Sequence, residues 1–203
     1  MKSNPRTQGE RSAATKDALV RAARPLFATR GFGGVATEAI VAAAGVTRGA
    51  MYHQFADKTE LFAAVFEAVE AEVMQRIGEG VDALGSLDPI ELMRLGARNW
   101  LDACAEPEVH RIVLVEAPAV LGWERWREIG LRYGLGMVQA LLAHAIDVGR
   151  VRPQPVEPLA HVLIGAIDEA ALYVAQADDR DRARVEVGAV LDDLVSALAV
   201  NSG

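Results

Sequence analysis

The segment 37–60, TEAIVAAAGVTRGAMYHQFADKTE, constrains the fold of this chain more than any other stretch. Thr37 is expected to cap a first short helix, whose apolar residues recur at helical spacing. Gly45 then stands where the chain turns sharply, because glycine takes a positive φ without steric cost. Thr47 is expected to cap a second helix. Two short helices joined by a glycine turn form a helix-turn-helix, whose second helix enters the major groove of DNA.

The composition of the second helix favours contact with DNA over packing within the protein. Gly49 and Ala50 have almost no side chain, so this face can approach another surface closely. Arg48 presents a planar set of donors that suits phosphate oxygens and guanine edges. Tyr52 and His53 carry polar tips that hydrogen-bond to phosphate. The alternative interpretation is a surface hairpin whose basic side chains are only solvated.

A third helix is predicted to begin at the segment DKTE. Asp57 is its N-cap and Glu60 follows three residues later, as in a capping box. Lys58 then lies in the first turn, where its ammonium and the free backbone N–H groups can hold a phosphate. The predicted DNA-binding residues are Thr37, Thr47, Arg48, Gly49, Ala50, Tyr52, His53 and Lys58.

Residues from about 14 to 66 closely resemble the DNA-binding domain of the TetR family of bacterial transcriptional regulators. The resemblance covers about a quarter of the chain without a gap. A second segment, 112–129, looks like the ligand-domain sequence of one actinobacterial-type subgroup of that family, and it names no ligand. The matching residues of the first resemblance are Phe27, Arg30, Gly31, Phe32, Thr37, Ile40, Ala44, Gly45, Val46, Thr47, Gly49, Tyr52, Phe55, Lys58, Leu61 and Phe62.

The net charge of −7 hides an uneven distribution along the chain. Residues 1–60 hold nine Lys and Arg against five Asp and Glu, a net of +4. Residues 61–203 hold the remaining 12 and 23, a net of −11. A basic end attached to an acidic body suits a DNA-facing domain and a body that DNA repels. We therefore expect a DNA-binding domain over 1–60, with a flexible basic arm over 1–12, and a ligand-binding and dimerisation domain over 61–203.

Composition limits the class of protein. With 51% hydrophobic and 24% charged residues, the chain is a folded globular protein. Its polar N-terminal segment lacks the apolar core of a signal peptide, and charged residues interrupt the longest apolar stretches, so no transmembrane helix is expected. The single Cys104 excludes an internal disulfide and a thiolate zinc site. We expect a cytoplasmic protein without cofactor, metal or membrane contact.

The spacing of apolar residues predicts an all-α protein. Pro25 is expected to kink the first helix, Gly78 and Gly80 to end the fourth, and Pro118 and Gly122 to break the chain after the sixth. A further interruption is possible near Gly134. The helices beside the helix-turn-helix are expected at 13–29, 58–77, 89–105, 107–115, 123–144, 157–177 and 181–200.

The last two predicted helices have broad apolar faces, together with small residues that allow close helix approach. These faces can bury against the subunit's own helices. The family resemblance implies instead a homodimer, in which the two helices of each subunit form a four-helix bundle. The physical argument agrees, because a two-fold dimer reads an inverted repeat through two half-sites.

Aromatic and methionine side chains cluster in the middle helices, where the resemblance implies an internal ligand cavity. Such side chains suit a mostly apolar pocket, although each of them is also typical of a packed core. His144, Asp168 and Glu169 are weaker polar candidates. The predicted pocket residues are Met93, Trp100, His110, Glu116, Trp123, Trp126, Tyr133 and Met137.

Enzymatic interpretations have weaker support. Glu106 with His110, and Glu157 with His161, share a helix face and form half of a metal site. The chain has no HExxH, no Glu-x-x-His and no G-x-S-x-G motif. We therefore expect no enzyme; a helical-bundle enzyme and a helical adaptor that ignores DNA remain the alternatives.

These patterns predict a transcriptional regulator that binds double-stranded operator DNA as a homodimer. The family resemblance implies a repressor that a small apolar ligand releases from a palindromic operator. Tilting of the helix that begins at Lys58 would change the spacing of the two recognition helices. The sequence names neither operator nor ligand, and it does not separate repressor from activator.

Overall fold

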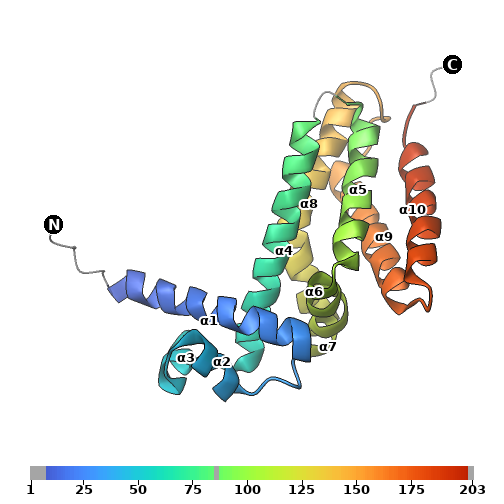
Figure 1. The fold of residues 1–203 in the computed structure, drawn as a ribbon. Coiled ribbons are helices and arrows are strands. Elements are labelled where there is room, and N and C mark those ends of the chain that lie inside the picture. Colours follow the sequence, from blue (N-terminus) through green and yellow to red (C-terminus); the bar gives the residue numbers. More distant parts are fainter. Residues whose placement is uncertain (1–7, 85–86, 201–203) are drawn as a thin grey trace.

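The computed structural model describes residues 8–84 and 87–200, and these form an all-α fold with one isolated antiparallel bridge between Val151 and Ala199. A small N-terminal group of helices lies beside one end of a longer helical body (Figure 1). The elements are α1 (Gln8–Arg30), α2 (Thr37–Ala44), α3 (Arg48–Gln54), α4 (Lys58–Ala83), α5 (Pro89–Ala105), α6 (Pro107–Val109), the π-helix η1 (His110–Glu116), α7 (Ala117–Leu121), α8 (Trp123–Asp147), α9 (Val156–Gln176) and α10 (Arg180–Ser196).

The N-terminal helices share a core with the start of α4. Phe27 of α1 packs edge-on against Phe62 of α4, with ring centroids 5.2 Å apart. Ile40 of α2 and Met51 of α3 are fully buried in the same core. The expected boundary after residue 60 therefore falls inside the first turn of α4, whose next residues complete the packing of α1.

Helix α4 is longer than its sequence suggests. It continues to Ala83, so the expectation that Gly78 and Gly80 end the helix is wrong. Ile77 and Val81 are both buried on one stripe of the helix. Because that burial stabilises the last turns, it offsets the roughly 1 kcal/mol by which each glycine disfavours a helix interior. One rod thus runs from the N-terminal helices through the length of the body (Figure 1).

The first helix also differs from its prediction. It begins at Gln8, so residues 8–12 belong to α1 and not to a flexible arm; residues 1–7, with Lys2 and Arg6, lie outside the described residues. The helix continues without interruption across the exposed Pro25. Ser12 and Gln54 exchange side-chain hydrogen bonds of 3.1 and 2.9 Å, which connect the N-terminal part of α1 to the end of α3.

In the body, α6, η1 and α7 form one continuous helical stretch that ends at Gly122, where φ is +81°. Pro118 does not break it, and this proline lies in α7 directly after the π-helix. Helix α8 likewise passes through Gly134 without interruption.

Helices α8 and α9 are long and apolar enough to cross a membrane by length and hydropathy, contrary to the expectation from the sequence. This is weak evidence for a membrane protein, since core helices of soluble proteins pass the same test. Arg127 of α8 forms an ion pair with Asp168 of α9, and both helices pack against α5.

Candidate DNA interface and ligand pocket

The turn between α2 and α3 has the geometry that its sequence predicts. Gly45 adopts φ +67°, and its N–H donates to the carbonyl of Ala42. The N–H of Val46 donates to Val41, which closes the end of α2. Thr47 caps α3, because its hydroxyl accepts the N–H of Ala50 at 3.1 Å. These bonds fix how α3 lies relative to α2.

One face of α3 is exposed while the opposite face anchors it. Met51 is fully buried, whereas Arg48, Gly49 and His53 are exposed and Tyr52 is 44% exposed. Ala50 is half-buried. The predicted hydrogen-bond donors Arg48, Tyr52 and His53 therefore lie on one accessible surface. Gly49 and Ala50, which have little or no side chain, lie beside them. This arrangement suits insertion into a groove.

Arg48 is held loosely at this surface. Its Nη1 lies 2.9 Å from Glu38 Oε1, and its guanidinium lies over the ring of Tyr52, with Cζ 5.6 Å from the ring centroid. Both partners of the ion pair are mostly exposed, so the pair adds little stability. A phosphate or a guanine edge can compete with Glu38 for the guanidinium.

Two predicted phosphate ligands have other roles in the structure. The N-cap of α2 is Ala36, without a side-chain bond, so Thr37 is not the cap but the first, half-buried helical residue. Lys58 donates to the carbonyls of Phe32 and Val35 at 2.9 and 3.0 Å, and its ammonium lies over the Phe32 ring. Lys58 thus binds the loop between α1 and α2, with one N–H left for a phosphate.

The N-terminal helices are joined to the body by ion pairs as well as by α4. Arg125 of α8 makes a bidentate pair with Glu60 in the first turn of α4, at 2.6 and 2.8 Å. Arg24 of α1 contacts both Glu72 and Glu108. The Arg24 guanidinium lowers the pKa of the Glu72 carboxyl, as Arg125 lowers the pKa of Glu60.

A close backbone approach lies at the same junction. Gly31, at the end of α1, has φ +70°, and a Cβ there would lie 2.3 Å from Glu116 Oε1. Glu116 belongs to η1, and its carboxylate lies 3.8 Å from the Nε of Arg111. The end of α1 therefore packs on side chains of the π-helix, and the positive φ at Gly31 favours glycine there.

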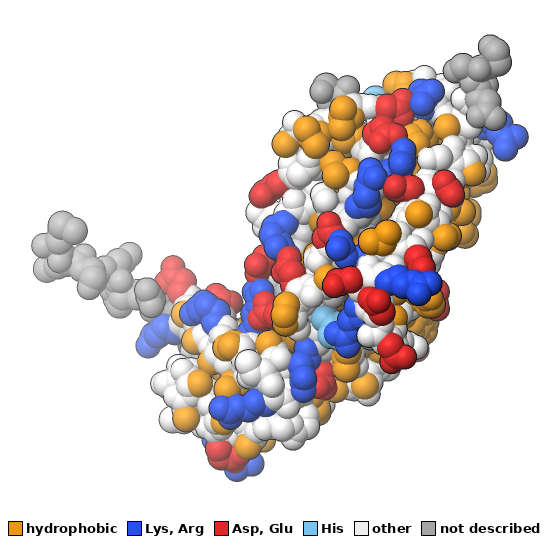
Figure 2. Space-filling model, turned by 45° about the vertical axis from the view of Figure 1, so that its right-hand side comes forward, with side chains coloured by type: hydrophobic (Ala, Val, Ile, Leu, Met, Phe, Trp, Pro, Cys, Tyr) orange, Lys and Arg blue, Asp and Glu red, His pale blue; other side chains and the backbone are white. Residues whose placement is uncertain are grey.

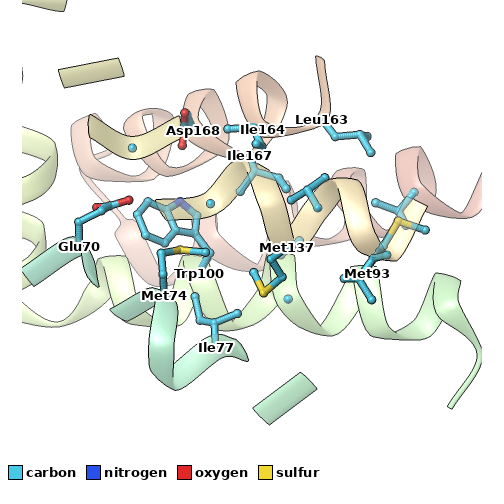
Figure 3. A pocket seen from close by; sticks show the side chains of 17 residues that line it. Glu70, Met74, Ile77, Met93, Trp100, Met137, Leu163, Ile164, Ile167 and Asp168 are labelled. Carbon is cyan, nitrogen blue, oxygen red and sulfur yellow. The ribbon is translucent and has the colours of Figure 1, made fainter. Parts of the chain in front are cut away.

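The body contains a partly open cavity of about 80 Å³, well above the roughly 10–15 Å³ that one water needs. It lies among α4, α5, α8, α9 and α10, and Figure 3 shows its labelled side chains. Most of the lining is apolar. The lining residues are Glu70, Met74, Ile77, Met93, Gly96, Ala97, Trp100, Gly130, Gly134, Met137, Val138, Leu141, Leu163, Ile164, Ile167, Asp168 and Val195.

Two carboxyl groups lie at one end of this cavity. Glu70 is only 4% exposed, and its burial, with the charge of Asp168 nearby, raises the pKa of the Glu70 carboxyl to about 8. Burial raises the pKa of Asp168 to about 6, against the lowering influence of Arg127 at 2.5 Å. Glu70 is therefore mainly neutral at pH 7.

Of the predicted pocket residues, Met93, Trp100 and Met137 line the cavity. The other five do not. Trp126 is a core residue whose Nε1 donates to the Val113 carbonyl at 2.9 Å, and Tyr133 packs half-buried against that core. Trp123 is 57% exposed beside Trp126.

The two polar candidates among these five lie elsewhere. Glu116 faces Gly31 and Arg111 at the junction described above. His110 lines a separate cavity beside Arg180 and Arg184. Burial lowers the pKa of its imidazole, as do the charges of Arg180 and Arg111. Of the weaker candidates, His144 and Glu169 are exposed, and Asp168 lines the cavity.

Glu70 is not among the pocket residues predicted from the sequence, although a signal for it is present. Glu70 lies four residues after Phe66 and three before Val73, so it stands on the apolar stripe of α4. A lone carboxyl on a stripe that faces the core marks a buried polar site. Among the described residues, no group of three or more His, Cys, Asp or Glu side chains is placed to hold a metal ion.

Comparisons with known proteins agree with this architecture. Residues 19–65 match the family described as bacterial regulatory proteins, tetR family, and residues 90–198 match the tetracyclin repressor-like C-terminal domain. The Tn10 TetC protein of Escherichia coli is 26% identical over 170 residues, which cover 84% of this chain and 85% of that protein.

Solved structures give the same result. A TetR-family transcriptional regulator from Pectobacterium atrosepticum is 32% identical and superposes with a TM-score of 0.84, covering 97% of this chain and 99% of that one. RolR, solved in complex with resorcinol, is 21% identical with a TM-score of 0.75 and coverages of 94% and 93%. The second likeness shows the fold alone.

The exposed recognition helix, the capped turn and the helical body define a helix-turn-helix DNA-binding regulator. The two family matches together place both ends of the chain in one such family. The chain belongs to the TetR family of bacterial transcriptional regulators.

Proposed function

We propose that this protein is a cytoplasmic dimeric repressor that leaves a palindromic operator when a small apolar ligand enters the cavity of the body. The observation that carries the proposal is the largely apolar cavity, which α4 lines with Glu70, Met74 and Ile77. The same helix begins at Lys58, directly after α3. A ligand that displaces α4 therefore moves the DNA-binding helices.

The DNA contacts that we propose come from the exposed face of α3 and its neighbours. Arg48 reads or clamps, Gly49 and Ala50 permit close approach, and Tyr52 and His53 bind phosphate. Thr47 supports the helix as its cap and stands at the same exposed end. Thr37 and Lys58 are secondary contacts, since both lie half-buried.

The dimer that we propose forms through α9 and α10. These helices carry large apolar side chains that remain exposed in the single subunit: Val162, Tyr173, Val185, Val190 and Leu194. Figure 2, turned to bring the right-hand side of Figure 1 forward, shows hydrophobic side chains along the edge of the body among interspersed charges. An exposed apolar patch on two adjacent helices is typical of an obligate interface.

The ligand class that we propose is a small, mostly apolar molecule. Apolar side chains from five helices line the cavity, and only Glu70, Asp168 and the indole of Trp100 are polar. The structure of RolR, whose fold is similar, holds the small aromatic molecule resorcinol. We propose entry of a molecule of comparable size here.

Selection of bound sequences from random duplex DNA tests the proposal most directly. We expect the purified full-length protein to enrich an inverted repeat at moderate salt, and its affinity to fall with rising salt. The Arg48→Ala variant is the matched control, because Arg48 is exposed and its loss leaves the fold intact. Enrichment of single half-sites contradicts the dimeric arrangement. Absence of any enrichment by folded, unliganded protein contradicts the repressor mechanism.

A further inference from the structure

The body has a second cavity, apart from the first one among α4, α5, α8, α9 and α10. Its volume is about 130 Å³, and it lies among α5, η1, the second half of α9 and the start of α10. The two cavities share no lining residue among those described. An engineered apolar cavity of about 150 Å³ holds a benzene molecule, so this partly open space has room for one aromatic ring.

Most of the wall of the second cavity is apolar and uncharged. Leu101 of α5, Leu114 of η1 and Val174 of α9 line it, and all three are buried. Cys104 lies on the same wall, and burial raises the pKa of its thiol, so the thiol is neutral at pH 7. The wall therefore suits the hydrocarbon part of a ligand.

The charged residues of the second cavity come from the first turns of α10. They are Arg180, Asp181 and Arg184. Arg184 is neutralised by an ion pair with Asp102 of α5. Arg180 forms no ion pair with any residue that the structure describes, and it is exposed. An exposed residue that also lines a cavity stands where the cavity meets solvent, so Arg180 brings a free positive charge to the opening.

His110 shows that this charge is felt inside the cavity. Burial lowers the pKa of the His110 imidazole, and the charges of Arg180 and Arg111 lower it further. Asp181 does not offset them at this point. The imidazole is therefore neutral at pH 7, and the surrounding field is positive.

This combination selects a singly charged anion with an apolar body. A guanidinium binds a carboxylate through two parallel N–H···O bonds. A cation meets the positive field around His110, and a neutral molecule gains nothing from the free guanidinium. A small dianion such as phosphate meets the carboxylate of Asp181 and has no apolar surface for the wall.

We propose that the second cavity binds a small organic monocarboxylate, with its carboxylate on Arg180 and its hydrocarbon part against Leu101, Leu114 and Val174. This site is separate from the cavity to which we assign the regulator's ligand. The proposal does not rest on that assignment.

The position of the second cavity connects it to the N-terminal helices. His110 and Leu114 belong to η1, and α6 directly precedes η1. Glu108 of α6 forms a bidentate pair with Arg24 of α1, at 2.9 and 2.7 Å. The start of α10 also lies at the end of the body that carries α6 (Figure 1). A ligand that displaces η1 therefore acts on the helices that hold the recognition helix.

Three probes of one shape and different charge test the proposed site: benzoate, benzamide and benzamidinium. By calorimetry on the full-length protein at pH 7, we expect benzoate to bind about tenfold or more tightly than benzamide, because charge-assisted hydrogen bonds are the stronger ones. Benzamidinium is expected to bind most weakly. Equal binding of benzoate and benzamide overturns the proposal, as does tightest binding of benzamidinium. Failure of benzoate to bind at millimolar concentration overturns it as well.

Two arginine variants locate the carboxylate. Arg180→Gln removes the charge at the opening, so benzoate affinity is expected to fall about tenfold, to the level of benzamide. Arg182→Gln is the matched control, because Arg182 is 74% exposed on the same helix and does not line the cavity. It is expected to change benzoate affinity less than about twofold, since solvent and salt screen an exposed charge. Circular dichroism checks that both variants fold. An equal loss in both variants, or no loss in Arg180→Gln, contradicts the placement.

Side-chain NMR signals distinguish the two cavities. Benzoate is expected to raise the pKa of His110, because its carboxylate offsets the charge of Arg180. The variant His110→Gln identifies the signal among the four histidines. The methyl signals of Met93 and Met137, which line the first cavity, are expected to stay unchanged. Benzoate that shifts these methyl signals and leaves His110 unchanged overturns the proposal.

Operator binding by the same preparation separates this proposal from the proposed function. If the protein binds an inverted repeat and no benzoate, the second site alone fails. If benzoate binds beside His110 and the protein binds no DNA, the second site stands and the repressor proposal fails. Operator affinity that does not change at saturating benzoate contradicts the connection through η1.

Discussion

At the residue scale, Glu70 is the side chain whose environment departs furthest from what its type prefers. A carboxyl on the apolar stripe of a long helix is expected to be exposed or paired, yet its Oε2 is buried and unpaired. Proteins retain such groups at functional sites at the expense of stability. This carboxyl belongs to the lining of a cavity that is otherwise mostly apolar.

The stability of the fold is expected to depend on pH through Glu70. Its pKa of about 8 in the folded protein lies above the ordinary value of 4.5. Between these values the unfolded chain is ionised while the folded chain keeps its proton, so stability falls as pH rises. Below pH 4.5 this loss is absent, and above about pH 8 it is complete.

Glu70→Gln is therefore expected to stabilise the protein by roughly 3 kcal/mol at pH 7 and by almost nothing near pH 4. Urea unfolding of both proteins across this range measures the difference. Two other groups, Asp168 in its pair with Arg127 and the buried Cys104, are present in both proteins. Their contributions to the pH dependence of stability therefore largely cancel in the comparison. A difference that does not change with pH contradicts the assigned pKa.

Tyr52 tests the recognition surface at the level of one side chain. Tyr52→Ala removes a 44% exposed ring from α3 and leaves the buried Met51 anchor in place. We expect operator affinity to fall about tenfold or more while the protein stays folded and dimeric. Tyr52→Phe keeps the contact with Arg48 and isolates the hydroxyl. Normal operator binding by Tyr52→Ala, measured by fluorescence anisotropy, contradicts the placement of the recognition helix.

At the scale of elements, glycine has opposite consequences in a helix and in a turn. A Cβ at Gly78 or at Gly45 meets nothing within 4 Å, so space does not distinguish them. Gly78 lies inside α4, whereas Gly45 has φ +67°. Gly78→Ala is expected to stabilise the protein by about 0.5–1 kcal/mol, and Gly45→Ala to destabilise it by about 1–2 kcal/mol.

Thermal or urea unfolding of these two variants provides the comparison. The prediction concerns the sign of the change in stability for each substitution. That sign depends on the backbone conformation of the glycine and not on contacts of the new side chain. If both substitutions change stability in the same direction, the conformational argument at one of the two sites is wrong.

The sequence predicts well those helices and turns whose ends are determined by capping or turn residues next to them. The glycine turn with the Thr47 cap, the Asp57 cap of α4 and the whole of α5 follow from residues adjacent to each end. The far end of α4 depends on burial of Ile77 and Val81 by other helices, which no local rule contains. The π-helix η1 has no local signature in this sequence.

The cavity was harder to predict for a related reason. Trp100, Trp123 and Trp126 are chemically equivalent in the sequence, yet they line the cavity, face solvent and fill the core respectively. The different environments of these three tryptophans depend on how α5 and α8 are rotated about their axes when they pack. Met93, Trp100 and Met137 were identifiable by type, whereas the α9 residues Leu163 and Ile167 were expected at the dimer face or in the core.

At the scale of the whole molecule, the proposed dimer makes the sharpest prediction. Val190→Glu places a charge on α10, where the side chain is 63% exposed in the single subunit. We expect a folded monomer by sedimentation velocity and a large loss of operator affinity, because one half-site then binds alone. Val148→Glu, at an exposed position after α8, is the matched control and should stay dimeric. A dimeric Val190→Glu protein contradicts the proposed interface.

The continuity of α4 has a consequence for building hybrid regulators. Each residue inserted into this helix between Phe66 and Glu70 turns everything beyond it by about 100° and advances it by about 1.5 Å. The pairs Glu60–Arg125 and Arg24–Glu72 stand on both sides of that segment, so such a rotation would misalign them. A sensing body transplanted from another regulator therefore has to join within α4 at an unchanged residue count. The rotation along α4 must be preserved at the junction of a hybrid. This requirement limits where the body of another regulator can be joined more than any interface between separately folded domains does.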